Sequence, residues 1–186
     1  MERFLKLSLF LIFIGVVQFK STTQELKDNI TDCIIKSEDV FVRGDSLSSM
    51  IYNGQRVKLL QGYYKCNSVE REDVIAYRYA GNDAPVIKIV KAVPGDEWYL
   101  KKNKAGNRYQ IIVNGESLRN SEDQLYQIPE YNSKTLQLYV KTYPKLRKDT
   151  YLILGNQVSG SADSTRFGLV DKSDIVGKII FKRRGE

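Results

Sequence analysis

The sequence predicts a mainly β domain that follows an N-terminal hydrophobic helix. The chain contains 12 Tyr and 7 Phe among its 186 residues, and aromatic side chains are enriched in strands. From residue 40 onward, short apolar runs alternate with glycine, asparagine and proline turn signals, as in a β-rich domain. A chain of this length can bury one substantial core. We therefore expect one β-rich domain over residues 40–186.

The N-terminal segment is the exception to this pattern. Residues Phe4–Phe19 are almost continuously apolar, with Arg3 before them. The run is shorter than the ~20 residues that comfortably span a bilayer, so a cleaved signal peptide is the alternative to an anchor. No small-x-small cleavage site follows, which favours an uncleaved membrane anchor over residues 1–20. Its charge distribution places the domain outside the cytoplasm, and the polar residues 21–39 would form the linker.

Nine segments have the composition of strands, and turn dipeptides such as Asn53-Gly54 and Asn114-Gly115 lie between them. No long amphipathic helix is expected after the linker. The expected strands are Val40–Arg43, Gln55–Leu60, Asp73–Tyr79, Val86–Val93, Trp98–Lys102, Arg108–Val113, Leu136–Thr142, Thr150–Leu154 and Ile175–Lys182.

The composition excludes several classes of site. The chain has no histidine, which rules out a Ser-His-Asp triad and imidazole metal ligands. Cys33 and Cys66 lack the spacing of a metal site, and either one disulfide or two thiols fit them. The net charge of +7 is spread along the chain, which favours solubility and acidic lipid headgroups over nucleic acid. No metal or cofactor is expected.

Two residues are candidates for nucleophilic chemistry without histidine. Ser46 follows Gly44-Asp45, a context in which serine is most often a simple turn residue. Lys88 lies among strand-forming apolar residues in Val86–Val90, where it would either extend to solvent or be buried. Burial that lowers a lysine pKa from 10.4 to ~8 raises the neutral fraction at pH 7 to about 10%. A neutral amine of this kind can accept the proton of a serine hydroxyl.

Four segments carry a resemblance to a known family. Ser46 with its glycine and Asn53-Gly54 resembles the nucleophile box of type I signal peptidases, and Val86–Asp96 resembles their lysine box. Val113–Glu116 is similar to the family's Asn-Gly hairpin. Leu154–Val170 follows the family's terminal box, with agreement at its Ser-x-Asp-Ser and aromatic-Gly positions. The resemblance covers about residues 40–182.

This resemblance implies a fold, a reaction and a set of site residues. The fold would be the family's β-ribbon or partly open barrel. Ser46 would be the nucleophile and Lys88 the general base, with Ser161 hydrogen-bonded to the lysine and Asp163 behind it. Gly44 would stand where some members carry a serine that completes the oxyanion hole. The protein would be a membrane-bound serine endopeptidase that removes signal peptides from exported precursors.

The departures from the family pattern leave alternatives open. A specialised relative that matures one pilin or conjugation component is one, and an inactive envelope binding module is another. A self-cleaving repressor domain uses the same chemistry, but the hydrophobic N-terminus argues against it. Without the family's arginine, the support of Asp163 would be weaker or rebuilt through Arg166. The departures are Leu47 for Met, Ser49-Met50 for Pro-Thr, Asn156-Gln157 for Asp-Asn, and Thr165 for Arg.

Overall fold

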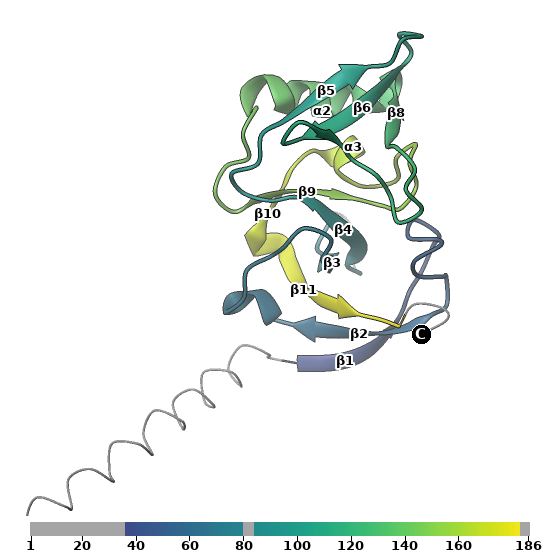
Figure 1. The fold of residues 1–186 in the computed structure, drawn as a ribbon. Coiled ribbons are helices and arrows are strands. Elements are labelled where there is room, and N and C mark those ends of the chain that lie inside the picture. The colour runs from purple at the N-terminus through teal and green to yellow at the C-terminus, as the bar shows by residue number, and fades with distance from the viewer. Residues whose placement is uncertain (1–35, 80–83, 183–186) are drawn as a thin grey trace, which may run out of the picture.

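Two antiparallel sheets make up most of the computed structural model, which describes residues 36–79 and 84–182. The larger sheet has the strand order β1-β2-β11-β3-β4-β9-β10, and the smaller one has β5-β6-β7 with β8 also on β6. Figure 1 shows the two sheets one above the other, with the helix α2 (Glu130–Thr142) beside the upper one. The mainly β fold class is confirmed. The strands are β1 (Lys36–Phe41), β2 (Arg56–Gln61), β3 (Val74–Tyr77), β4 (Val86–Ala92), β5 (Trp98–Lys102), β6 (Arg108–Val113), β7 (Glu116–Ser117), β8 (Gln127–Pro129), β9 (Thr150–Leu154), β10 (Val170–Asp171) and β11 (Ile175–Ile180).

The central strands are apolar because both of their faces are covered. All four residues of β3 and the last five of β4 are buried, and a strand covered on both sides is mostly apolar. The exceptions in β4 are the buried lysines Lys88 and Lys91. β2 instead alternates exposed and buried residues in its first half, as expected for a strand with one solvated face. Lys88 therefore lies within the buried centre of the larger sheet.

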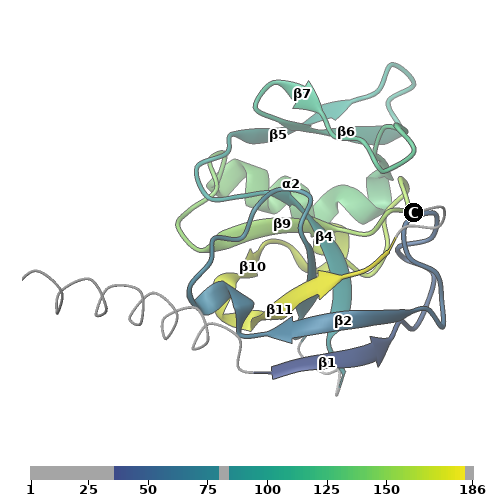
Figure 2. The ribbon, with the colours of Figure 1, turned by 60° about the horizontal axis from the view of Figure 1, so that its bottom comes forward.

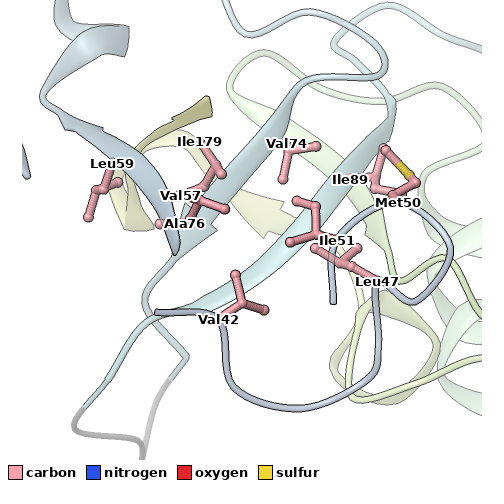
Figure 3. Packing of buried hydrophobic residues seen from close by; sticks show 10 residues of the cluster. All are labelled: Val42, Leu47, Met50, Ile51, Val57, Leu59, Val74, Ala76, Ile89 and Ile179. Atoms are coloured by element: carbon pink, nitrogen blue, oxygen red, sulfur yellow. The ribbon is translucent and has the colours of Figure 1, made fainter. Parts of the chain in front are cut away.

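The apolar core consists of three clusters. One lies beneath the loop that joins β1 to β2 and holds Val42, Leu47, Met50 and Ile51 against β3 and β4 (Figure 3). A second fills the space between the two sheets around Trp98. The third covers the other face of β3, β4 and β9. In the rotated view of Figure 2, α2 (Glu130–Thr142) lies between the small sheet and β9.

Helix α2 corrects the expectation of a strand at Leu136–Thr142 and of no long helix after the linker. The apolar residues Leu136, Leu138 and Val140 alternate, which is the pattern of a strand. In the structure Leu138 is 66% exposed, while Leu136, Tyr139 and Val140 face the second cluster. This is the helical spacing i, i+3, i+4. Pro129 stands at the N-cap, so the helix starts where the preceding strand β8 ends.

The boundary between linker and domain also differs from the expectation. β1 begins at Lys36 and pairs with β2 over its full length, so the last residues of the expected linker already belong to the sheet. The anchor expected over residues 1–20 and Cys33 lie outside the described residues. Within the described ranges, no helix is long and apolar enough to cross a membrane. Cys66 is disulfide-bonded.

Candidate active site

Ser46 lies in a short helical turn between β1 and β2. The turn is closed by hydrogen bonds from the N–H groups of Ser48, Met50 and Ile51 to carbonyls at the start of the loop. Leu47, Met50 and Ile51 are buried beneath it (Figure 3). Gly44, with φ +86°, precedes the turn, in a conformation that glycine adopts without strain. The apolar side chains thus fix the turn that presents Ser46.

Lys88 comes from β4 and meets Ser46 directly. Its Nζ donates one hydrogen bond to Ser46 Oγ at 2.9 Å and another to the Ile87 carbonyl at 2.8 Å. Lys88 is only 4% exposed, and burial lowers its pKa from the ordinary value of 10.5, while the charge of Asp163 acts in the opposite direction. Desolvation favours the neutral amine, which is the form that can accept a proton from the hydroxyl.

Asp163 is the buried acid behind the pair, and its carboxylate is fully hydrogen-bonded. One oxygen accepts from the Gly155 N–H, the Ser161 N–H and the Ser161 hydroxyl, the last at 2.6 Å. The other accepts from the N–H and the hydroxyl of Thr165. Asp163 has no exposed surface. Five donors can hold a buried carboxylate without a cation in contact.

The structure brings the supporting residues together in a different way from the one the resemblance implies. The Ser161 hydroxyl donates to Asp163, and no hydrogen bond joins Ser161 to Lys88 in the described part of the chain. Arg166 is exposed, and no ion pair joins its side chain to Asp163 within the described residues, so of the two alternatives left open the rebuilding through Arg166 is not found. Thr165 supports the Asp163 carboxylate instead, because its hydroxyl donates to one carboxylate oxygen at 2.7 Å.

Gly155 allows Ser46 and Ser161 to approach each other. A Cβ at this position would lie 2.5 Å from Ser161 Oγ and 2.7 Å from the carbonyl oxygen of Ser46. Both distances are shorter than carbon–oxygen contacts permit, so only glycine fits between them. The Gly155 carbonyl accepts a hydrogen bond from the buried Tyr126 hydroxyl at 2.5 Å, which fixes this residue from the opposite side.

Asn156 is the site residue whose role the sequence does not reveal. Its backbone N–H donates to the Ser46 carbonyl at 2.6 Å, and its side-chain amide donates to the Ser48 carbonyl at 2.7 Å. The sequence marks Asn156 only as a departure from the family's aspartate. Its contacts depend on the tertiary approach of two segments more than a hundred residues apart in sequence, and no local pattern indicates such contacts.

The arrangement defines a class of protein. A serine hydroxyl hydrogen-bonded to a buried lysine amine, in a chain without histidine, is the constellation of a Ser-Lys hydrolase. No group of three or more potential metal ligands occurs among residues 36–79 and 84–182.

Comparisons with known proteins identify the family. The family described as "Signal peptidase, peptidase S26" matches residues 29–183. Signal peptidase IB from Staphylococcus aureus strain COL is 30% identical over 155 residues, which cover 76% of this chain and 74% of that protein, and the strain N315 protein matches equally. A solved signal peptidase I from Enterococcus faecalis V583 aligns with 60% of this chain and 97% of its own, at 22% identity and a TM-score of 0.41. The chain belongs to the signal peptidase family, and it is a serine endopeptidase that removes signal peptides from exported precursors.

The hydroxyl of Thr165 provides a test of the support behind the site. Thr165→Val removes one donor from a buried carboxylate and keeps the volume, so we expect a loss of about 1–3 kcal/mol in the free energy of unfolding. Thermal unfolding of the purified protein would measure it. Thr165→Ser keeps the hydroxyl and should unfold within a few degrees of wild type. Equal unfolding temperatures for Val and wild type would contradict the assignment.

Proposed function

We propose that Ser46 and Lys88 form the catalytic dyad of this signal peptidase. The observation that carries the proposal is the 2.9 Å hydrogen bond between Lys88 Nζ and Ser46 Oγ, made by an amine that is almost fully buried. This distance lies within the range over which a general base takes a proton from a nucleophile.

The reaction follows from the positions of these two groups. Lys88, in its neutral form, accepts the hydroxyl proton while Ser46 Oγ attacks the scissile carbonyl. The resulting ammonium then donates a proton to the leaving amine, and an acyl-enzyme remains on Ser46. Lys88 next deprotonates a water molecule that attacks the acyl-enzyme and releases the signal peptide. Asp163 stabilises the ammonium electrostatically, because its charge favours protonated Lys88.

The developing oxyanion is best placed against the backbone N–H of Ser46. The Gly44 N–H donates to the Asn53 side chain, and the N–H groups of Ser48 and Met50 close the helical turn. The N–H of Ser46 has no partner within the described residues. One preorganised donor at the oxyanion contributes about 3 kcal/mol to transition-state stabilisation.

The substrate would bind as an added strand beside Lys88. On one side, Val86–Ile89 pairs with β3, whereas β9 pairs with β4 only from Ile89 onward. The second edge of Val86–Lys88 has no strand partner in the described part of the chain. Val42, directly after β1, and Ile87 belong to the same apolar cluster, so the chain at the end of β1 comes near this part of β4. An extended peptide that fills it would place its backbone next to Ser46.

The cellular setting is part of the proposal. The hydrophobic segment over residues 1–20 would anchor the protein in the membrane as a single span, with residues 40–186 on the extracytoplasmic side and against membrane lipid. This position agrees with substrates that are exported precursors. Fractionation of the full chain with membranes, together with protease accessibility of the domain from outside the cell, tests the anchor independently of catalysis.

Incubation with a defined precursor tests the reaction. The full-length protein in detergent should cut a precursor with an Ala-x-Ala site at one position, which mass spectrometry of both products identifies. Absence of cleavage with this and with other envelope precursors would overturn the proposal and favour a binding module.

The pH dependence of cleavage should report the titration of Lys88. Since the neutral amine is the active form and its pKa lies below 10.5, the rate should rise tenfold per pH unit at low pH and level off above that pKa. Rates measured from pH 6 to pH 10 with one precursor would show the plateau. A rate independent of pH over this range would exclude Lys88 as the base.

A further inference from the structure

The loop that presents Ser46 contains a strained residue next to a clamp. Ser49 has φ +74°, the left-handed region that costs non-glycine residues conformational energy. Such a conformation persists only where the surroundings hold it. The family pattern places a proline at this position, and proline is fixed near φ −65°. The loop of this chain therefore has a backbone path at Ser49 that the family's proline does not permit.

The clamp is the side chain of Asn156. Its Nδ2 donates to the Ser48 carbonyl at 2.7 Å, directly before the strained residue, and also to the Ser121 hydroxyl at 2.9 Å. Its Oδ1 accepts from the Ser121 N–H at 3.0 Å. A carbonyl can only accept and an N–H can only donate, so these partners fix which end of the amide is which.

Asn156 is itself held rigidly. It is 3% exposed, and its carbonyl accepts a hydrogen bond from the Asn120 side chain at 3.0 Å. The Asn156 backbone N–H holds the Ser46 carbonyl. One residue thus fixes the nucleophile loop at Ser46 and Ser48 and connects it to the segment around Ser121.

The family's aspartate does not fit this position. A carboxylate could accept from the Ser121 N–H, but its second oxygen would face the Ser48 carbonyl at the 2.7 Å now bridged by a donor. Two oxygens at that distance repel each other, and the Ser48 carbonyl would lose the hydrogen bond that Asn156 now gives it.

We propose that Asn156 is a positioning residue that holds the Ser46 loop in the left-handed path at Ser49, and that the aspartate of the family and the proline of the family are both incompatible with this loop. The proposal rests on Ser46 as the nucleophile for its catalytic consequence, whereas the structural clamp does not depend on catalysis.

The experiment compares full-length Asn156→Ala, Asn156→Asp and Gln157→Ala. Gln157 is the matched control, because it is adjacent and exposed, and within residues 36–79 and 84–182 its side chain donates only to the Asp45 carbonyl, at 3.2 Å in an exposed position. Misplacement of a nucleophile by about 1 Å costs on the order of 100-fold, so both Asn156 variants should lose about 10–100-fold in kcat. KM should change less than about twofold, since the open edge of β4 is untouched. Asn156→Asp should be at least as impaired as Asn156→Ala, and Gln157→Ala much less.

Rescue distinguishes positioning from general destabilisation. Adding Ser49→Gly to Asn156→Ala removes the strain that the clamp must hold, so kcat should recover by several-fold, as a double-mutant cycle would show. Ser49→Pro in the otherwise native chain should reduce kcat as strongly as Asn156→Ala.

Hydrogen exchange gives a readout that does not need activity. Deuterium uptake by the segment 45–51, followed by mass spectrometry, should be at least about tenfold faster in Asn156→Ala than in wild type, and unchanged in Gln157→Ala. If the wild type cleaves precursors and Asn156→Asp keeps its kcat, or if exchange in Asn156→Ala equals that of wild type, the clamp is refuted while the dyad stands. If no precursor is cleaved but exchange rises as expected, the clamp stands and the proposed function fails.

Discussion

Lys88→Met is expected to abolish precursor cleavage and to make the folded protein more stable at neutral pH. Loss of a general base from a nucleophile pair lowers kcat by about 10⁴-fold or more. Methionine fills a similar volume among apolar neighbours without a charge, so the free energy of unfolding should rise by roughly 1–3 kcal/mol at pH 7. Few substitutions combine these two effects, because most inactive variants are also less stable.

The sign of this stability difference follows from the pKa of Lys88. Folding lowers this pKa below 10.5, so the unfolded chain binds the proton more tightly than the folded one, and wild-type stability rises as pH increases from the folded pKa to 10.5. The difference in the free energy of unfolding between Lys88→Met and wild type should be constant below the folded pKa of Lys88. It should shrink as pH rises from that pKa to 10.5. Thermal unfolding of both proteins from pH 6 to pH 10 would measure it. If the stability difference between Lys88→Met and wild type instead grows with pH, Lys88 is charged and stabilising in the folded protein.

Ser46→Ala is expected to cause the largest loss of activity. It removes the atom that forms the acyl-enzyme, and comparable nucleophile deletions lower kcat by about 10⁶-fold. Ser48→Ala removes the neighbouring hydroxyl, whose one hydrogen bond among the described residues is to the Asp45 carbonyl in its own turn, so it should cost less than about tenfold. Product formation followed by gel and mass spectrometry would measure both variants. A larger loss for Ser48→Ala than for Ser46→Ala would contradict the assignment of Ser46 as the nucleophile.

An acyl-enzyme trap adds an independent measurement to the Ser46 test. Acid quenching of wild type during turnover should reveal protein with the mass of the signal peptide added, located on the peptide that contains Ser46. Ser46→Ala should show no added mass. Mass on any other residue would contradict the assignment.

The sequence predicts those parts of the structure that depend on local pattern. Eight of the nine expected strands correspond to strands in the structure, because runs such as Trp98–Lys102 and Arg108–Val113 combine β-forming residues with clear turn signals. The strand predicted at Leu136–Thr142 is wrong. Three alternating apolar residues fit a strand, and only the tertiary contacts of Tyr139 with the second cluster select the helix. β7, β8 and β10 are too short to give a pattern.

For the candidate site, the sequence predicts which residues meet but not how they bond. The boxes of the resemblance bring Ser46, Lys88, Ser161 and Asp163 into one place, as the structure has them. The direction of the Ser161 hydroxyl depends on which acceptor lies closer, and Asp163 is at 2.6 Å. The role of Thr165 depends on a hydroxyl that replaces a guanidinium in a buried space, and only coordinates reveal it.

The position of β11 has a consequence for the order in which the larger sheet can form. This strand lies between β2 and β3 in the larger sheet (Figure 1), so the hydrogen-bonded ladder from the strands that flank Ser46 to β3 and β4 runs through residues 175–180. During synthesis β2 and β3 are complete long before β11 leaves the ribosome. The larger sheet of this chain can therefore close only after residues 175–180 have been synthesised.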